Sequence, residues 1–218
     1  MNTAALTPEE LARLPVFPLP RVVFFPGSTL PLHLFEPRYR AMIEHCMSDG
    51  PQAFAVALLE PGYEADYEGR PAIRTLAGVG RIVAHEAQRD GTHDVLLQGL
   101  HRVRLEELHD PSLPFRTAKA TIVEPTSTEV PLGELQALLA CATQVAQVVR
   151  AQHPDFAIGT SIESGAAHVA DTLADRFVAA PEARQAILEE LDLRARVSKV
   201  MDAVGGLLAM LATRETPS

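Results

Sequence analysis

The chain has 218 residues, of which 47% are hydrophobic and 22% are charged, and its formal net charge is −9. This composition is typical of one large or two small folded domains, and it excludes a wholly disordered chain. The acidic charge and the lack of any Lys/Arg cluster argue against a nucleic-acid binder, which needs a basic footprint.

Short strands separated by prolines are predicted for the start of the chain. The segment 14–40 contains six prolines and is nevertheless one of the most apolar stretches. The runs VFPLP (16–20) and VVFFP (22–26) are β-branched or aromatic and end in proline, which sheets tolerate at strand starts, edges and bends. Pro26-Gly27 is a turn signal. We therefore expect short strands that turn sharply, as at the corner of a small barrel.

A helix is predicted over 36–50. Pro37 suits its first turn, and Gly50 lies just past its end. Four apolar residues recur at helical spacing: Tyr39, Met42, Ile43 and Cys46.

Further strands are predicted over 53–59, 78–87, 94–108 and 115–125. The first is wholly apolar, the pattern of a strand covered on both faces. Asp90-Gly91 is a hairpin turn signal between the second and third. In the strand predicted over 94–108, Val103 and Leu105 alternate with charged residues, so one face of this strand should be exposed to solvent. The acidic segment 60–69 predicts an exposed loop.

The pattern becomes helical after a polar joint at 126–131. The first helix has no charged residue from 135 to 149. An ordinary surface helix has a polar stripe, which here consists only of Gln136, Thr143, Gln144 and Gln147. Two interpretations stay open: a central helix packed by its neighbours, or a partly open apolar face for a partner.

Start signals divide the remaining chain into three helices. Thr160 to Glu163 matches a capping box. Pro181 opens the next helix and Asp192 caps the last, in which Gly205-Gly206 is a weak point. Asp171 and Asp175 share one helix face, where paired carboxylates could do acid–base work. A solvated helix face is the favoured interpretation of that pair.

Motifs for the common catalytic sites are missing. No glycine is followed by lysine, so the P-loop is absent, and neither G-x-S-x-G nor H-E-x-x-H occurs. A Ser–Lys dyad needs a serine beside a desolvated lysine. Lys119 lies in a strand-like run and Lys199 in an amphipathic helix, neither in a setting that exposes a nucleophile. We predict no catalytic residue, no cofactor and no metal site.

The opening stretch FPLPRVVFFPGSTLPLHLFEPRYRAMIE (17–44) resembles the start of the Lon protease N-terminal domain, also called the Lon substrate-binding domain. The shared pattern is a strand ending in Pro26-Gly27, then Leu-Pro-Leu, then FEPRY opening a helix. Later segments follow in the family's order: GVGRIV (78–83), DVLLQGLHRVRLEEL (94–108), HVADTLADRFV (168–178) and ILEELDLRARVSKVM (187–201). The resemblance covers roughly 14 to 205.

This resemblance implies an α+β fold, a PUA-like β pseudo-barrel followed by an α-helical bundle. We place the β-rich lobe at 1–125 and the helical lobe at 126–218. In Lon, this module precedes an ATPase and a Ser–Lys peptidase and helps to capture unfolded clients. Both catalytic modules are missing here, so the chain resembles a free-standing form of the domain. The family assigns no catalytic residue to this part.

The apolar surplus of the opening stretch supplies the candidate polypeptide-binding residues. Six of its side chains cannot all point inward from an alternating strand: Phe24, Phe25, Leu30, Leu32, Leu34 and Phe35. Some should be exposed as a binding surface or covered by the helical lobe. Tyr63 and Tyr67, in the acidic loop, complete the candidate set.

The leading hypothesis is a non-enzymatic module that binds unfolded or apolar protein segments, or an adaptor for a protease or ATPase. A homo-oligomer is compatible with it. The alternatives are an RNA-binding PUA-like module, by fold analogy alone, and a peptidase by family name only.

The cellular location is expected to be cytoplasmic. The N-terminus lacks the basic and apolar regions of a signal peptide, and no apolar stretch approaches the ~20 residues that span a bilayer. Cys46 and Cys141 are expected to be two reduced, partly buried thiols.

Overall fold

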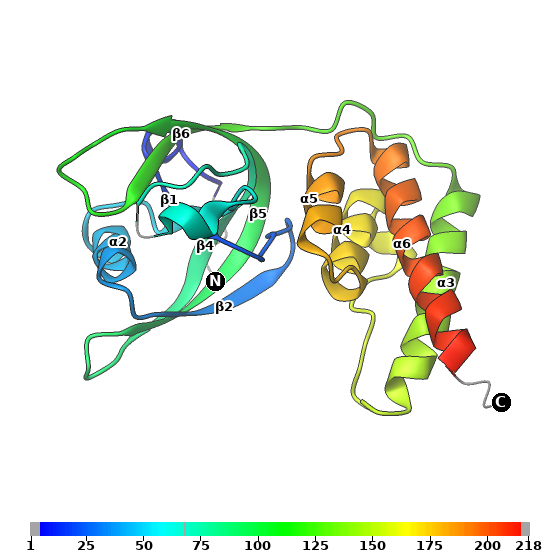
Figure 1. Ribbon diagram of the computed structural model, residues 1–218. Helices are drawn as coiled ribbons and strands as arrows, with labels where there is room; N and C mark the ends of the chain where they lie inside the picture. The colour runs from blue at the N-terminus through cyan, green and yellow to red at the C-terminus, as the bar shows by residue number, and fades with distance from the viewer. Residues whose placement is uncertain (1–4, 68, 215–218) are drawn as a thin grey trace. The chain divides into compact units, whose positions relative to one another are not determined.

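The computed structural model describes residues 5–67 and 69–214 of the chain, the last of them by its backbone only. The chain divides into two compact units, Met1–Val123 and Glu124–Ser218 (Figure 1). The first unit combines a sheet with helices and the second contains helices, so the fold is α+β, as predicted. Residue 68 of the predicted acidic loop lies outside the described residues.

Six strands make up the sheet of the first unit: β1 (Leu14–Leu19), β2 (Thr29–Leu34), β3 (Ala53–Leu58), β4 (Leu76–Ala87), β5 (His93–Leu108) and β6 (Arg116–Ile122). Their order is β2-β5-β4-β3-β1-β6, and an additional pairing joins β5 to β6. That pairing closes β5, β4, β3, β1 and β6 into a ring and leaves β2 attached outside it. The ring is the pseudo-barrel that the resemblance implied. It closes because β5 is long enough to pair with β2 at its start and with β6 at its end.

Small side chains fill the interior of the ring. Six alanines are buried there: Ala53, Ala55, Ala57, Ala77, Ala118 and Ala120. A ring of only five strands encloses little space, which favours alanine over larger residues. All six residues of β3 are buried, which confirms the prediction of a strand covered on both faces.

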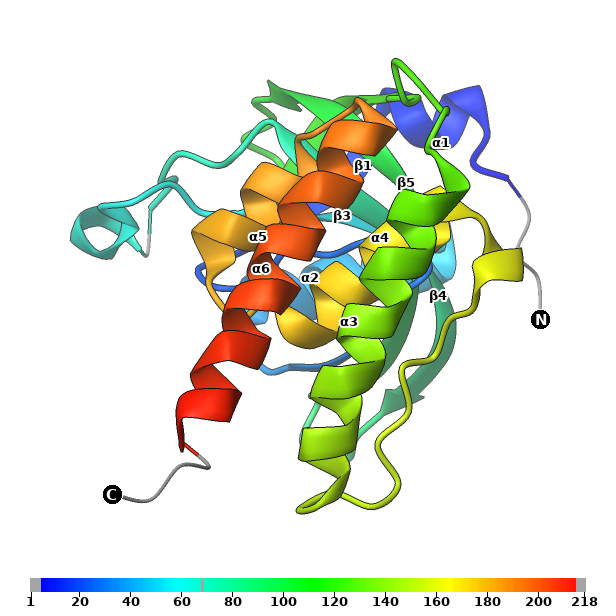
Figure 2. The same cartoon turned by 90° about the vertical axis from the view of Figure 1, so that its right-hand side faces the viewer.

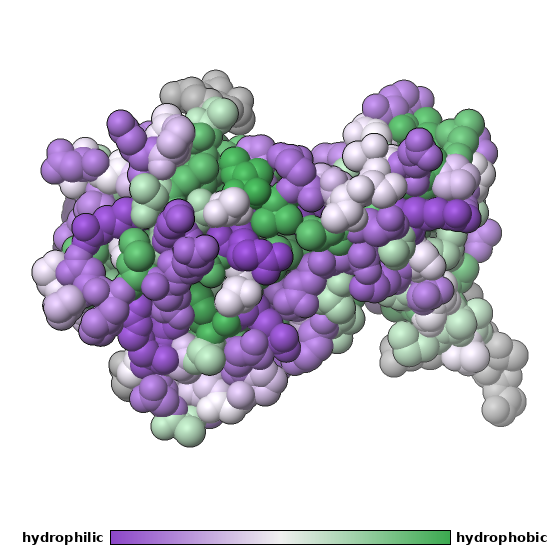
Figure 3. All heavy atoms as spheres, turned by 90° about the horizontal axis from the view of Figure 1, so that it is seen from above, coloured by the Kyte–Doolittle hydropathy of each residue, from purple (hydrophilic) through white to green (hydrophobic). Residues whose placement is uncertain are grey.

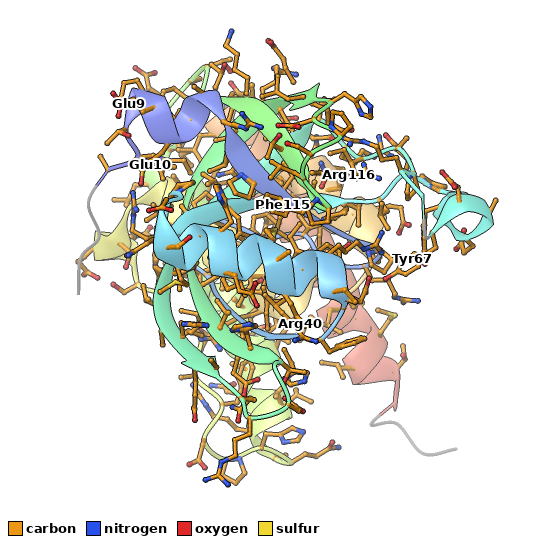
Figure 4. All side chains as sticks on the ribbon, turned by 90° about the vertical axis from the view of Figure 1, so that its left-hand side faces the viewer. Glu9, Glu10, Arg40, Tyr67, Phe115 and Arg116 are labelled. Atoms are coloured by element: carbon orange, nitrogen blue, oxygen red, sulfur yellow. The ribbon has the colours of Figure 1, made fainter. Side chains whose placement is uncertain are left out.

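Helix α2 (Pro37–Ser48) lies across the strands of the first unit (Figure 4). Its four predicted apolar residues, Tyr39, Met42, Ile43 and Cys46, are all buried against the sheet. The aromatic ring of Tyr39 meets that of Phe17 edge to face, with 4.4 Å between centroids. Burial raises the pKa of the Cys46 thiol to about 12, so this cysteine stays protonated and unreactive.

The run 22–26 forms no strand, contrary to the sequence prediction. It crosses the α2 side of the sheet as irregular chain, where three glycines leave room for it. A Cβ atom at Gly78 would lie 1.9 Å from the carbonyl oxygen of Phe24, and one at Gly99 would lie 2.2 Å from that of Phe25. Gly80 makes space for the Phe24 ring in the same way. The segment is thus held by close approach of two backbones rather than by strand pairing.

The turn after this segment is anchored on β5. Gly27 has a φ of 82°, and its N–H donates to the Gly99 carbonyl at 3.0 Å. The Gly99 N–H in turn donates to the Ser28 carbonyl at 2.8 Å. These bonds set the start of β2, which pairs antiparallel with β5 from Thr29 onward. Strand β2 therefore begins at Thr29, three residues after the end of the strand predicted over 22–26.

A short N-terminal helix was missed by the sequence analysis. Helix α1 (Pro8–Ala12) starts with a capping box, in which the Thr7 hydroxyl accepts from the Glu10 N–H and the Glu10 carboxylate accepts from the Thr7 N–H. The Glu10 carboxylate also accepts two hydrogen bonds from Arg81 of β4, at 3.1 and 3.2 Å. The spacing T-x-x-E was the available signal for this helix.

The second unit packs four helices: α3 (Leu132–Arg150), α4 (Ala166–Phe177), α5 (Pro181–Leu188) and α6 (Leu193–Arg214). Figure 2 shows α3 and α6 side by side, diverging toward their C-terminal ends. Arg194 and Glu134 form an ion pair at their N-terminal ends, 2.5 Å apart. Pro181 opens α5, as predicted, and the Asp192 carboxylate caps α6 by accepting from the Ala195 N–H at 2.8 Å.

Two local predictions in this unit are wrong. The capping serine is Ser161, one residue after the predicted Thr160, and it caps a short 3-10 helix before α4. Helix α6 continues through Gly205-Gly206 without a break. The modest cost of glycine in a helix, about 1 kcal/mol for each residue, is not enough to break α6 here.

The favoured interpretation of Asp171 and Asp175 as a solvated face is also wrong. The Asp171 side chain is 3% exposed and pairs with Arg196 of α6, whose side chain is 1% exposed, at 3.5 Å. Asp175 pairs with Arg184 of α5 at 2.5 Å. The Arg196 Nε also donates to the Glu190 carbonyl at 2.9 Å. Both carboxylates therefore join helices within the unit.

Helix α3 settles part of the question left open by the sequence. Leu135, Leu138, Ala142, Val145 and Ala146 are buried, while Gln, Thr and Ala side chains occupy the exposed side. By length and composition α3 is also apolar enough to cross a membrane, contrary to the sequence expectation. The core helix of a soluble protein passes that same test, so this single helix is weak evidence for a membrane span.

Replacing Gly78 by alanine should lower the free energy of unfolding by about 1–3 kcal/mol or more, because the new methyl group overlaps the Phe24 backbone. Urea unfolding followed by circular dichroism measures this change. Gly205→Ala is the control, since its Cβ meets nothing within 4 Å and alanine favours helix by up to about 1 kcal/mol. Equal stability of Gly78→Ala and the parent would contradict the close approach.

Asp171→Asn should lower the free energy of unfolding by about 3–5 kcal/mol, because it leaves the Arg196 charge buried without its counter-ion. Asp202→Asn, on an exposed side of the same helix pair, should change it by less than about 0.5 kcal/mol. Thermal and urea unfolding of both variants compare the two sites. A similar small change in both would mean that the buried pair is dispensable.

Candidate functional site

The structure separates the eight candidate residues into core and accessible groups. Phe24, Phe25 and Leu34 are 2%, 0% and 1% exposed and belong to the core. Their side chains are therefore not accessible to a partner in this fold. Leu30 and Leu32 are half-buried against the α2 cluster, whereas Phe35 is 63% exposed. Of the opening stretch, Phe35 is therefore the accessible aromatic residue.

Phe35 lies at the corner where β2 ends and α2 begins. Glu36 is the N-cap residue with extended backbone, and Pro37 occupies the first helical turn. Proline fixes its own φ and disfavours the helical conformation in the residue before it. Pro37 therefore prevents α2 from starting earlier in the chain. The corner is thus short and stiff, and it holds Phe35 outward.

Arg38 ties this corner to the loop that follows β3. Its Nε donates to a Glu36 carboxylate oxygen at 2.9 Å, and its Nη1 donates to the Tyr67 carbonyl at 3.4 Å. The guanidinium also lies 4.8 Å from the ring centroid of Tyr39 and 5.5 Å from that of Tyr67. Desolvation opposes its charge, but Tyr39 and Glu36 outweigh that effect and raise the pKa of Arg38. The cation is therefore permanent and fixed.

Tyr67 forms a wall of the site, and Figure 4 shows it near one end of α2. Its hydroxyl donates to Glu36 at 3.4 Å, and its ring packs 6.2 Å from that of Tyr63 in the 3-10 helix Tyr63–Asp66. Both tyrosines are half-buried against the ring of strands rather than fully exposed. The two tyrosines therefore form a wall that rests on the strands, and they project into solvent less than Phe35 does.

A hollow of about 650 Å³ opens between these groups, and we call it the Phe35 hollow. It is lined by Phe35, Glu36, Pro37, Arg38 and Tyr67. Two of the eight candidates, Phe35 and Tyr67, thus meet although 32 positions separate them. Glu36 and Arg38 were missed as site residues, because in the sequence FEPRY signals only the start of a helix. A hollow with aromatic walls and a fixed cation suits apolar or aromatic side chains.

The two lysines of the sequence both form ion pairs. Lys119 pairs with Glu106 at 4.0 Å, and Lys199 pairs with Glu190 at 2.7 Å. A lysine that keeps a salt bridge at the surface is not a desolvated base. Among residues 5–67 and 69–214, no group of three or more His, Cys, Asp or Glu side chains is placed to hold a metal ion.

Apolar side chains also reach the surface elsewhere. Figure 3 shows them on both units, interrupted by hydrophilic residues. Among residues 5–67 and 69–213, the exposed large ones are Phe35, Leu108, Leu132 and Met210. Scattered apolar residues are normal on protein surfaces, so exposure by itself marks no site. Phe35 differs because it borders a hollow with a second aromatic wall.

A model of the substrate-binding domain of the ATP-dependent protease La (LON) matches residues 13–204. The chain belongs to the LON substrate-binding domain family. It is similar to Lon protease 2 of Myxococcus xanthus, with 30% identity over 193 residues that cover 87% of this chain and 23% of that protein. Lon protease of Anaeromyxobacter dehalogenans gives 30% identity over 88% of this chain. The chain thus spans about a quarter of the length of these curated relatives.

Solved structures of the family share the fold. A Lon N-terminal domain protein from Xanthomonas campestris superposes with a TM-score of 0.63 at 23% identity, covering 87% of this chain and 97% of that one. The N-terminal domain of the Mycobacterium avium complex Lon protease gives the same TM-score at 15% identity. At these identities the likeness establishes the fold and carries no residue roles.

Proposed function

We propose that this chain is a non-catalytic, cytoplasmic module that binds unfolded or apolar polypeptide segments, alone or as an adaptor for a protease or ATPase. The family description names substrate binding, and the relatives are named as proteases. The observation that carries the proposal is Phe35, a 63% exposed aromatic ring at the edge of the Phe35 hollow.

The chemistry of this hollow supports binding of apolar side chains. A rigid aromatic ring offers a large contact area and loses little conformational entropy when it binds. The hydrogen bonds of Arg38 to Glu36 and Tyr67 hold the walls before a client arrives, which reduces the entropic cost of binding. A volume of about 650 Å³ accommodates one or two large side chains of an extended segment.

Phe35→Ser should weaken binding of a reduced, unfolded client protein by about 5- to 150-fold, which corresponds to about 1–3 kcal/mol. The melting temperature should stay unchanged, because Phe35 packs little against its own unit. Leu132→Ser is the matched control, since Leu132 is 61% exposed in the second unit and should not affect binding. Fluorescence anisotropy and thermal unfolding give the two measurements. Unchanged affinity in the folded Phe35→Ser variant would exclude this hollow as the client site.

The purified chain should hydrolyse neither ATP nor casein, because the P-loop and the Ser–Lys dyad are absent from its sequence. Phosphate release and casein cleavage are the measurements. Activity that survives stringent purification and disappears on substitution of a single serine or lysine would overturn the non-catalytic assignment.

A further inference from the structure

A second hollow, of about 580 Å³, lies on the face of β2, β5 and β4 that is opposite α2. We call it the back groove. Strand register places six of its lining residues on that one face, because they are direct cross-strand partners: Pro31, His33, Ala84, Glu86, Asp94 and Leu96. Its position is therefore fixed by backbone pairing and does not depend on flexible side chains alone.

The register arranges these residues in two rows across the three strands. Pro31, Leu96 and Ala84 pair in succession and form an apolar row. His33, Asp94 and Glu86 pair in succession two residues further along and form a polar row. Rows two residues apart along a strand are separated by about 7 Å. An extended chain presents neighbouring side chains on that same length scale.

The polar row carries negative charge. Asp94 accepts hydrogen bonds from His33 Nδ1 at 2.8 Å and from Gln88 at 2.6 Å, and these bonds hold the pKa of its carboxyl below the ordinary value. Glu86 lies directly opposite Asp94, and no hydrogen bond or ion pair joins it to any of the described residues. Like charges opposite each other on adjacent strands repel. A cation placed over this row would relieve that repulsion.

The back groove adjoins the Phe35 hollow. The ring of His33, in the polar row, stacks on the ring of Phe35 with 6.3 Å between centroids and 26° between planes. One extended segment can therefore contact Phe35 and continue into the back groove. The groove thus extends the site of the proposed function rather than forming a separate one.

We propose that the back groove selects, among apolar polypeptide segments, those that carry a lysine or arginine next to an apolar residue. This inference rests on the proposed function. The apolar neighbour packs on Pro31, Leu96 and Ala84, and the cation lies over Glu86 and Asp94. An aspartate or glutamate at the same place in the client is repelled. The module therefore selects its client by charge as well as by hydrophobicity.

Three fluorescein-labelled peptides test this, with the sequence Ser-Gly-Ser-Leu-Phe-X-Leu-Ser-Gly-Ser and X as lysine, norleucine or glutamate. The parent should bind the lysine peptide about three- to tenfold more tightly than the norleucine peptide, and the glutamate peptide most weakly. Anisotropy at low and high salt measures the affinities. The lysine preference should shrink at high salt, because exposed charges are screened there.

Substitutions in the groove locate the effect. Glu86→Gln should bring the lysine-to-norleucine affinity ratio close to one, and Glu86→Lys should reverse the order so that the glutamate peptide binds best. Glu9→Gln is the matched control, because it changes net charge equally at an exposed position on α1. It should leave the ratio unchanged. Leu96→Ser should weaken all three peptides and preserve the ratio, since it shortens the apolar row without altering charge.

The outcomes separate this inference from the proposed function. If Phe35→Ser weakens all three peptides while the lysine preference is absent or insensitive to Glu86→Gln, client binding stands and the charge selection is wrong. If Glu9→Gln lost the lysine preference to the same extent, that preference would be a general effect of net charge. The proposal that the back groove selects for charge would then be wrong. If the parent binds neither the peptides nor a reduced, unfolded protein, both proposals fail.

Discussion

The first unit depends on the close approach between the 22–27 segment and the strands beneath it. Gly78 and Gly99 let the Phe24–Phe25 backbone lie directly on the sheet, where a side chain would collide with it, and Gly80 makes room for the Phe24 ring. This contact buries two phenylalanines without strand pairing. It also places Gly27 beside β5, where backbone hydrogen bonds with Gly99 set the register in which β2 pairs with β5.

The position of the candidate site follows from that register. A slip of one residue along β5 would exchange the faces of β2 and turn its leucines away from α2. With the observed register, Leu34 enters the core and Phe35 emerges at the corner before α2. Pro37 then fixes the helix start, and Arg38 links the corner to Tyr67. The exposed Phe35 is thus held between the buried Leu34 before it and the hydrogen-bonded Arg38 after it.

The two hollows of this unit differ in chemistry, and β2, which lines the back groove, leads directly into Phe35 of the other hollow. The Phe35 hollow has aromatic walls and an arginine held by a carboxylate, so its charge is largely neutralised. The back groove keeps the Glu86 carboxylate without a cation partner among the described residues. Because the ring of His33, in β2, stacks on that of Phe35, just after β2, an aromatic surface and a charged one lie side by side. The ring of strands provides the rigidity that both surfaces require.

Local patterns in the sequence determined the helix over 36–50, the buried strand at 53–59, the α+β class and the family, because periodicity, turn residues and FEPRY are short-range features. Its apolar surplus near Phe35 also pointed to the site region. Tertiary structure decided which of those residues are accessible: strand pairing, invisible in one sequence, separates Phe35 from Leu34. It also made Asp171 a buried partner of Arg196 and placed Tyr67 against Arg38. These contacts join residues 25 or more positions apart, and no local pattern encodes which distant side chains will meet.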